Sequence, residues 1–329
     1  MGPVSTSSTP AATPASAPES LSVVVPVYNS EAILPELVRR LEAVLRTTGR
    51  LFEVILVDDD SADGSWQTIV DLSDRYDFVY GQCLMRNFGQ HNALLAGIRL
   101  AKGDLIVTLD DDLQHPPEEI PKLLAKLDDG FDVVYGTPQQ EQHGFLRDLA
   151  SRATKLALRS AMGAETAQKV SAYRVFRCAL RDAFAGYASP YVSIDVLLTW
   201  GTKRFSSVVV RHDARHSGPS NYTLRKLVVH ALNMATGFSV LPLQLASLVG
   251  FGFTVFGTCV LAYVLGRFMI QGTSVPGFPF LASVIAIFSG AQLFAIGIIG
   301  EYLARMHVRA MGRPAYSVRT ATTKERERG

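Results

Sequence analysis

Two clusters of consecutive aspartates are the strongest chemical signal in the sequence. The first cluster, residues 58–60, follows an apolar run that ends at Val57, and the second, residues 110–112, follows a run that ends at Leu109. Ligands of an open parallel sheet bind beyond the carboxyl ends of its strands, so we expect the two clusters to face one crevice. Solvated turns are the alternative, and they would explain one cluster better than both.

Neighbouring carboxylates repel one another, and a cation relieves that repulsion. A divalent ion that is bound together with substrate phosphates needs only one or two protein carboxylates. The aspartates therefore predict a Mg²⁺ or Mn²⁺ site that also receives a phosphorylated ligand. The three cysteines, Cys83, Cys178 and Cys259, lie too far apart in the sequence for a structural zinc site or a disulfide framework.

Composition limits the class of protein. The 329 residues carry a formal net charge of +2 and are 48% hydrophobic, which suits one sizeable domain with an appendage. This charge does not fit a nucleic-acid binder. Residues 1–20 consist almost entirely of Ser, Thr, Pro, Ala and Gly, so we expect a disordered tail without the basic and apolar regions of a signal peptide.

Short apolar runs alternate with helical patterns between Leu21 and about Gly136, which predicts an α/β domain with a mostly parallel sheet. The expected strands are Leu21–Val27, Phe52–Val57, Phe78–Leu84, Asp104–Leu109, Phe131–Tyr135 and Ser206–Val210. The expected helices are Glu31–Leu45, Gln90–Ala101, one that Pro116 and Pro117 open and that ends near Asp129, then Phe145–Met162 and Tyr173–Phe184.

Two long apolar stretches follow this domain. Residues 241–270 contain one charged residue, Arg267, and residues 278–300 contain none, so each exceeds the ~20 residues that cross a bilayer. A pair of buried core helices is the alternative. Basic residues flank both stretches whereas the linker 271–277 is uncharged, so the positive-inside rule places both flanks in the cytoplasm. Residues 223–240 have the pattern of an interfacial amphipathic helix.

Five segments together resemble a known family. They are Val25-Pro26-Val27-Tyr28-Asn29, Val57-Asp58-Asp59-Asp60-Ser61 with Asp63-Gly64, Arg86 to His91, Leu109 to Glu118, and Arg215 with Gly218, Ser220 and Tyr222. As a set they resemble the polyisoprenyl-phosphate glycosyltransferases of glycosyltransferase family 2. The resemblance covers residues 21 to about 316. It implies a GT-A fold, which is Rossmann-like with a mostly parallel sheet, followed by interfacial helices and two transmembrane helices.

The resemblance also implies roles for individual residues. Asp110 and Asp112 match the DxD pair of the family, in which Asp112 would hold Mg²⁺ or Mn²⁺ against the diphosphate of a nucleotide sugar. Gln114 would lie beside this ion. The positions that match the base and ribose pocket are Pro26, Val27, Tyr28, Asn29, Glu31, Asp58 and Asp59. The positions that match a grip on the acceptor lipid phosphate are Arg147, Ser151 and Arg215, and arginine offers a planar fork of donors suited to phosphate.

The sequence departs from the family pattern in three places. Asp60 stands where the family usually has Gly, and Asp111 stands where a small residue is common. Residues 138–142 are not basic, so one expected arginine contact to the acceptor phosphate is missing. Residues 168–171 lack the aspartate that many relatives carry there, for which Asp195 would be a stand-in as a base.

A phosphate acceptor reduces the need for such a base. The second pKa of a phosphate monoester is about 6, so this nucleophile is already ionised near neutral pH, whereas a hydroxyl acceptor would need a general base. The protein would mainly align the phosphate with the sugar and neutralise the departing diphosphate. Direct in-line attack would invert the anomeric centre.

The sequence therefore predicts a metal-dependent inverting transferase that moves a sugar, with a UDP-sugar as the favoured donor, onto polyprenyl phosphate for the cell envelope. We expect a multi-pass protein of a prokaryotic plasma membrane and a homo-oligomer such as a tetramer. A transferase acting on a hydroxyl acceptor and a catalytically silent binding scaffold are the alternatives. The expected organisation is a tail (1–20), a catalytic domain (21–222), an interfacial helix (223–240), a transmembrane hairpin (241–304) and a cytoplasmic C-terminal tail (305–329).

Overall fold

The computed structural model describes residues 19–138, 170–213, 241–271 and 277–324. Three sequence-based predictions lie outside these residues: the disordered tail apart from its last two positions, the helix Phe145–Met162 and the interfacial helix 223–240. The candidate phosphate contacts Arg147, Ser151 and Arg215 lie outside them as well.

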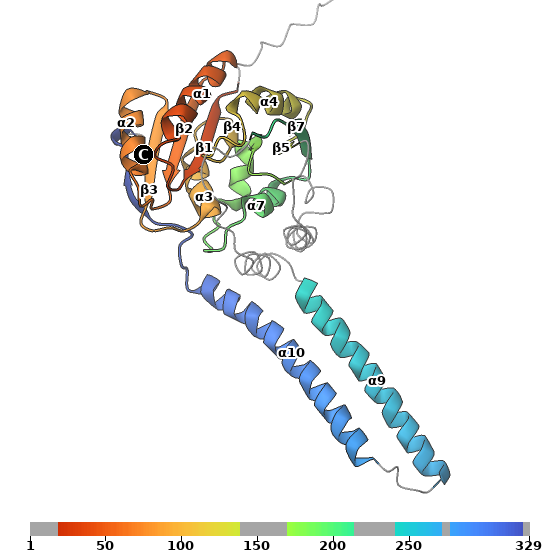
Figure 1. The fold of residues 1–329 in the computed structure, drawn as a ribbon. Helices are drawn as coiled ribbons and strands as arrows, with labels where there is room; N and C mark the ends of the chain where they lie inside the picture. Colours follow the sequence, from red (N-terminus) through yellow and green to blue (C-terminus); the bar gives the residue numbers. More distant parts are fainter. Residues whose placement is uncertain (1–18, 139–169, 214–240, 272–276, 325–329) are drawn as a thin grey trace, which may run out of the picture.

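One sheet organises the part of the chain that the structure describes. Its eight strands lie in the order β7-β5-β6-β4-β1-β2-β3-β8 (Figure 1). All pairings are parallel except those of β6 and β8, so the prediction of a mostly parallel sheet is confirmed. The strands are β1 (Leu21–Val27), β2 (Phe52–Asp58), β3 (Val79–Leu84), β4 (Leu105–Thr108), β5 (Val133–Pro138), β6 (Arg174–Arg177), β7 (Phe205–Val210) and β8 (Val318–Ala321).

Helices cover both faces of the sheet and produce two apolar cores. Residues of one strand alternate between the cores, because Val23 and Val25 of β1 point to one side and Val24 points to the other. One core lies under α1 (Leu34–Thr47), α2 (Ser65–Arg75) and α4 (Ile120–Asp128). The other lies under α3 (Gln90–Leu100), the short helix η2 (Cys178–Phe184) and α7 (Ile194–Gly201), while the short helix η1 (Pro117–Glu119) leads into α4.

The predicted helix Tyr173–Phe184 is wrong over its first half. Arg174–Arg177 instead forms β6, which pairs antiparallel with β4 and β5, and only Cys178–Phe184 is helical. The side chains follow a period of two, since Tyr173 and Val175 enter one core and Phe176 enters the other. Pairing with strands distant in the sequence therefore overrides the local helical pattern.

The C-terminal segment also differs from the expectation of a tail over 305–329. The second apolar helix continues to Ala310, and β8 then joins the sheet beside β3. An unpaired strand edge exposes backbone N–H and C=O groups, and β8 satisfies those of β3. The sheet domain therefore includes residues from beyond the apolar hairpin as well as those before it.

Two long apolar helices extend away from the sheet domain, α9 (Leu241–Gln271) and α10 (Phe278–Ala310) (Figure 1). The stretches 243–270 and 287–310 are candidate membrane spans by length and composition, with mean hydropathies of 2.1 and 1.5. Among the side chains described in these stretches, only Ala246 is buried. The helices contact each other through an edge-to-face pair, Phe253 and Phe288, whose ring centroids are 5.7 Å apart. The exposure of this hairpin argues against the alternative of buried core helices.

The close contact between α9 and α10 depends on Gly257, where an added Cβ would lie 2.7 Å from Cζ of Phe288. Gly257→Leu should displace that ring and lower the stability of the hairpin by about 1–3 kcal/mol, as overpacked contacts do. The matched control is Gly266→Leu in the same helix, because a Cβ there meets no atom within 4 Å. Thermal unfolding in detergent measures both variants. Equal midpoints for the two variants would contradict the contact.

Candidate active site

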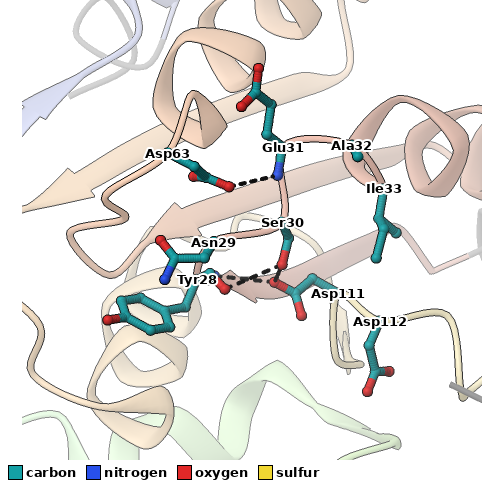
Figure 2. A pocket seen from close by; sticks show the side chains of 9 residues that line it. All are labelled: Tyr28, Asn29, Ser30, Glu31, Ala32, Ile33, Asp63, Asp111 and Asp112. Carbon is teal, nitrogen blue, oxygen red and sulfur yellow. Dashed lines mark hydrogen bonds between the residues drawn. The ribbon is translucent and has the colours of Figure 1, made fainter. Parts of the chain in front are cut away.

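Three loops meet at the carboxyl edge of the sheet. They follow β1, β2 and β4 and bring residues 28–33, 59–64 and 110–112 to this edge. A cavity of about 380 Å³ opens between them. Its lining residues are Tyr28, Asn29, Ser30, Glu31, Ala32, Ile33, Asp63, Asp111 and Asp112 (Figure 2). The expected crevice between two acidic loops is therefore present, although Asp63 and not the 58–60 cluster lines it from the second loop.

Asn29 joins the loop after β1 to the loop after β2. Its backbone is in the left-handed region with φ of 55°, a conformation that asparagine tolerates better than most residues. Its N–H donates to Oγ of Ser61 at 3.0 Å, and its side-chain oxygen accepts from the N–H of Ala62 at 2.8 Å. Asn29 is thus exposed and lines the cavity while its backbone and side chain both fix the neighbouring loop.

Glu31 makes a second reciprocal link between these loops. Its N–H donates to Oδ2 of Asp63 at 3.2 Å, and its carboxylate accepts from the N–H of Gly64 at 3.0 Å (Figure 2 shows the contact with Asp63). A Cβ at position 64 would lie 2.5 Å from Cδ of Glu31, so glycine is required for this approach. The wall of the cavity on this side is therefore held by backbone donors.

Asp111 ties the third loop to the first. Its Oδ2 accepts from Oγ of Ser30 at 2.6 Å and from the N–H of Tyr28 at 3.1 Å (Figure 2). Burial raises the pKa of this carboxyl group, and the two hydrogen bonds oppose that rise. The aspartate that departs from the family pattern is thus a structural link, and sequence reasoning missed this role and the partner Ser30.

Asp110 and Asp112 remain as the candidate metal ligands. Gln90 donates to Oδ1 of Asp110, while Oδ1 of Asp112 accepts from the N–H of Gln114 at 3.1 Å. Burial, followed by the negative charges of Asp112 and Asp111, raises the pKa of Asp110 to about 7, and the nearby cation of Arg174 opposes this rise. Repulsion between these carboxylates therefore favours the protonated form of Asp110.

A divalent cation would relieve the same repulsion, so the two carboxylates fit such an ion. The described residues contain no group of three or more His, Cys, Asp or Glu side chains that could hold a metal. Phosphate and water oxygens would have to complete the coordination, as is usual for Mg²⁺ beside a phosphorylated ligand. Gln114, predicted to lie beside the ion, is placed next to Asp112, and its carbonyl oxygen accepts from the N–H of Asp213 at 2.9 Å.

Four residues predicted for the base and ribose pocket lie behind the cavity wall. Pro26 and Val27 are buried in β1, and Asp58 and Asp59 are only 1% and 3% exposed. None of the four is among the lining residues, whereas Tyr28, Asn29 and Glu31 are. The strand positions therefore support the pocket, and the loop positions form its surface.

The carboxylate of Asp59 braces the loop after β3. It accepts from the N–H of Phe88 at 2.7 Å and from that of Gly89 at 2.8 Å, just before α3 begins. Burial raises the pKa of Asp59 to about 6 in spite of these two hydrogen bonds. Asp58 accepts from Sγ of Cys83 at 3.2 Å. Both aspartates are thus engaged with the protein itself.

Asp195 has a buried cation as its partner. It is 5% exposed, forms an ion pair with Arg174, which is 1% exposed, and accepts from the hydroxyl group of Tyr135 at 3.1 Å. Removing one member of a buried ion pair leaves the other charge uncompensated, so this contact is costly to break. The structure therefore supports a structural role for Asp195, not that of a base.

His115 packs beside the acidic site without entering it. Its ring lies 5.1 Å from that of His212 and 5.4 Å from that of Tyr173, and burial lowers its pKa to about 4. A neutral imidazole is a poor partner for a phosphate.

Comparison with known proteins places the chain in a class. The model of glycosyl transferase family 2 matches residues 22–185. Curated relatives extend the similarity over almost the whole chain, so the protein belongs to glycosyltransferase family 2 and is a glycosyltransferase of the GT-A fold.

The relatives are undecaprenyl-phosphate 4-deoxy-4-formamido-L-arabinose transferases. Those of Salmonella paratyphi A and Salmonella dublin are 35% identical over 303 residues, which are 91% of this chain and 93% of theirs. Solved structures also match. Glucosyl-3-phosphoglycerate synthase from Mycobacterium tuberculosis, in complex with Mn²⁺, UDP and glucosyl-3-phosphoglycerate, has a TM-score of 0.49 at 19% identity and covers 67% of this chain and 78% of its own.

The link that Asp111 makes can be tested by unfolding. Asp111→Ala removes an acceptor from Ser30 and Tyr28 and should lower the free energy of unfolding by about 1–2 kcal/mol, because two partly buried donors lose their partner. Asp111→Asn keeps one carbonyl oxygen and should lose less. Asp74→Ala, on the exposed surface of α2, is the control. Equal free energies of unfolding in urea for Asp111→Ala and the control would contradict the structural role of Asp111.

Proposed function

We propose that this glycosyltransferase moves a sugar from a nucleotide diphosphate, a UDP-sugar by preference, onto a polyprenyl phosphate with inversion at the anomeric carbon. The observation that carries the proposal is the acidic cavity of Asp111, Asp112 and residues 28–31 in a chain that also has two exposed apolar helices. The first feature suits a nucleotide diphosphate with its cation, and the second suits a lipid acceptor. The names of the Salmonella relatives support the same acceptor class.

In this proposal Asp110 and Asp112 would hold Mg²⁺ or Mn²⁺ together with the diphosphate. When bound, the ion would neutralise the charge that develops on the departing diphosphate. Tyr28, Asn29 and Glu31 would face the nucleoside, because they line the cavity at the end of β1. The hydrogen bonds from Asn29 and Glu31 to the loop after β2 would keep this wall in place during binding.

The acceptor phosphate would act as the nucleophile without a protein base. Its second pKa of about 6 leaves it ionised at neutral pH, and the ion pair of Asp195 with Arg174 agrees with a mechanism that lacks such a base. We assign the grip on this phosphate to Arg147, Ser151 and Arg215, as the sequence predicts. The protein's task is then alignment of one phosphate oxygen with the sugar carbon.

We further propose that α9 and α10 cross a prokaryotic plasma membrane with the catalytic domain on the cytoplasmic side, and that the product serves the cell envelope. Basic residues in the last turn of α10 and just after it, such as Arg309 and Arg313, support this orientation by the positive-inside rule. A homo-oligomer, such as a tetramer, remains the expected assembly.

The proposal predicts that purified protein with Mn²⁺, undecaprenyl phosphate and a panel of nucleotide sugars forms a labelled glycolipid from at least one of them. Asp112→Ala should slow this transfer roughly a hundredfold or more, since charge stabilisation by a metal is worth several kcal/mol. Asp71→Ala, on the exposed face of α2, is the control.

Three outcomes of this assay would contradict parts of the proposal. Equal transfer to undecaprenol, which lacks the phosphate, would favour the hydroxyl-acceptor alternative. Absence of transfer from every nucleotide sugar would favour the binding scaffold. Full activity of Asp112→Ala would contradict the metal role.

The pKa of Asp110, about 7 without metal, predicts how metal binding depends on pH. A protonated carboxyl group does not bind the cation, so Mn²⁺ must displace this proton, and its affinity should fall towards about tenfold per pH unit below pH 7. Titration calorimetry of Mn²⁺ with UDP in buffers of different ionisation enthalpy measures the proton release. Asp110→Asn should lower the release to the part that the terminal phosphate of UDP contributes. A pH-independent affinity between pH 5.5 and 7.5 would contradict the assignment.

A further inference from the structure

The strand β8 brings the end of the chain back from the second membrane helix to the catalytic domain. It pairs antiparallel with β3, where Gln82, Cys83 and Leu84 lie opposite Ala321, Thr320 and Val318. The N–H of Met85 donates to the carbonyl oxygen of Ser317 at 2.8 Å and extends the pairing by one bond. The sheet edge next to the loop after β2 is thus formed by residues that follow α10.

A β-bulge singles out one residue of this strand. The register shifts between Cys83 and Leu84, whose partners are Thr320 and Val318, so Arg319 is the extra residue without a partner in the pairing. Bulges redirect the side chain of the extra residue. The guanidinium group of Arg319 reaches Oδ1 of Asp60 at 2.8 Å and donates to the carbonyl oxygen of Met85 at 2.7 Å.

Asp60 occupies a central position in the loop after β2. It has a φ of 61°, in the left-handed region that favours glycine, and it stands where the family usually has glycine. The residue before it, Asp59, braces the loop at Phe88 and Gly89, and the residue after it, Ser61, accepts from Asn29. A displacement of Asp60 would therefore shift both the cavity wall and the loop after β3.

We infer that Arg319 is a positioning residue for the sugar-nucleotide site, supplied by the strand that follows the second membrane helix. Its charge holds Asp60 in the left-handed conformation and so keeps residues 59–62 in the shape that fixes Asn29 at the cavity. The inference rests on the proposed function, since it concerns the same pocket. The strand that follows the second membrane helix would therefore help to support the pocket.

The strand has other anchors, so it stays attached without Arg319. Nζ of Lys324 donates to the carbonyl oxygen of Ser73 at 2.6 Å at the end of α2, and the N–H of Thr322 donates to the carbonyl oxygen of Gly81 at 2.9 Å. The ion pair itself is half-exposed, with side chains 49% and 33% exposed, and such pairs add little to global stability. Arg319→Ala should therefore fold, and Lys324→Ala is a matched control on the same segment.

The first test needs no ligand. Hydrogen exchange of the full chain in lipid nanodiscs should show amides 59–62 of Arg319→Ala exchanging about tenfold faster than in the wild type, because a local contact is lost. Lys324→Ala should speed exchange only at the end of α2 and in β8. Unchanged exchange of amides 59–62 in Arg319→Ala overturns the inference, whether or not the protein shows transferase activity.

The second test separates positioning from a merely structural role. In the glycolipid assay Arg319→Ala should raise the KM for the nucleotide sugar about fivefold and leave kcat within about twofold, whereas Lys324→Ala should change neither. Arg319→Lys should recover part of the loss. Asp60→Asn, which tolerates the left-handed backbone but lacks the charge, should match Arg319→Ala, and the double variant should be no worse than either single one.

The outcomes divide clearly. Additive effects in the double variant, or an equal rise in KM for Lys324→Ala, would overturn the role of the pair. A wild-type chain that transfers no sugar from any donor would contradict the proposed function alone, and the exchange experiment would then decide the inference.

Discussion

Repulsion between carboxylates at one edge of the sheet is the constraint on which the rest of the site depends. Parallel strands bring the loops after β2 and β4 together, and each loop carries three consecutive aspartates. The fold gives Asp58, Asp59 and Asp111 hydrogen-bond donors from the protein itself. Asp110 and Asp112 also accept hydrogen bonds, from Gln90 and from the N–H of Gln114, but burial and the neighbouring negative charges still raise the pKa of Asp110 to about 7. A ligand with a divalent cation is the natural complement to these charges.

Most of the fold could be predicted because its central strands are buried on both faces and read as continuous apolar runs. The prediction failed for β6 and β8, which have only four residues each and pair with strands far away in the sequence. Neither has a local signal of its own. Tyr173 to Arg177 carries enough apolar residues to suit a helix as well, and only the partners in β4 and β5 decide between the two.

The position of the candidate site could be predicted from the sequence, but the role of each aspartate could not. The triplets are chemically uniform, so no pattern distinguishes Asp111, which bonds to Ser30, from Asp112, which lines the cavity. The two acidic departures from the family pattern, Asp60 and Asp111, have the same explanation. Asp60 meets Arg319 and Asp111 meets Ser30, so each added charge has a partner that lies far off in the sequence.

The apolar hairpin is joined to the sheet domain by more than the chain that leads into it. After α10 the chain returns through Ala315, whose carbonyl oxygen accepts from Asn92 of α3, and through β8. Arg305 near the end of α10 also lies 5.0 Å from the ring centroid of Tyr191 in the domain. A domain held at several points has less freedom to turn than one on a single linker, which raises the effective concentration of its site beside the bilayer. For the lipid acceptor proposed above, this restriction would favour encounter of the two substrates.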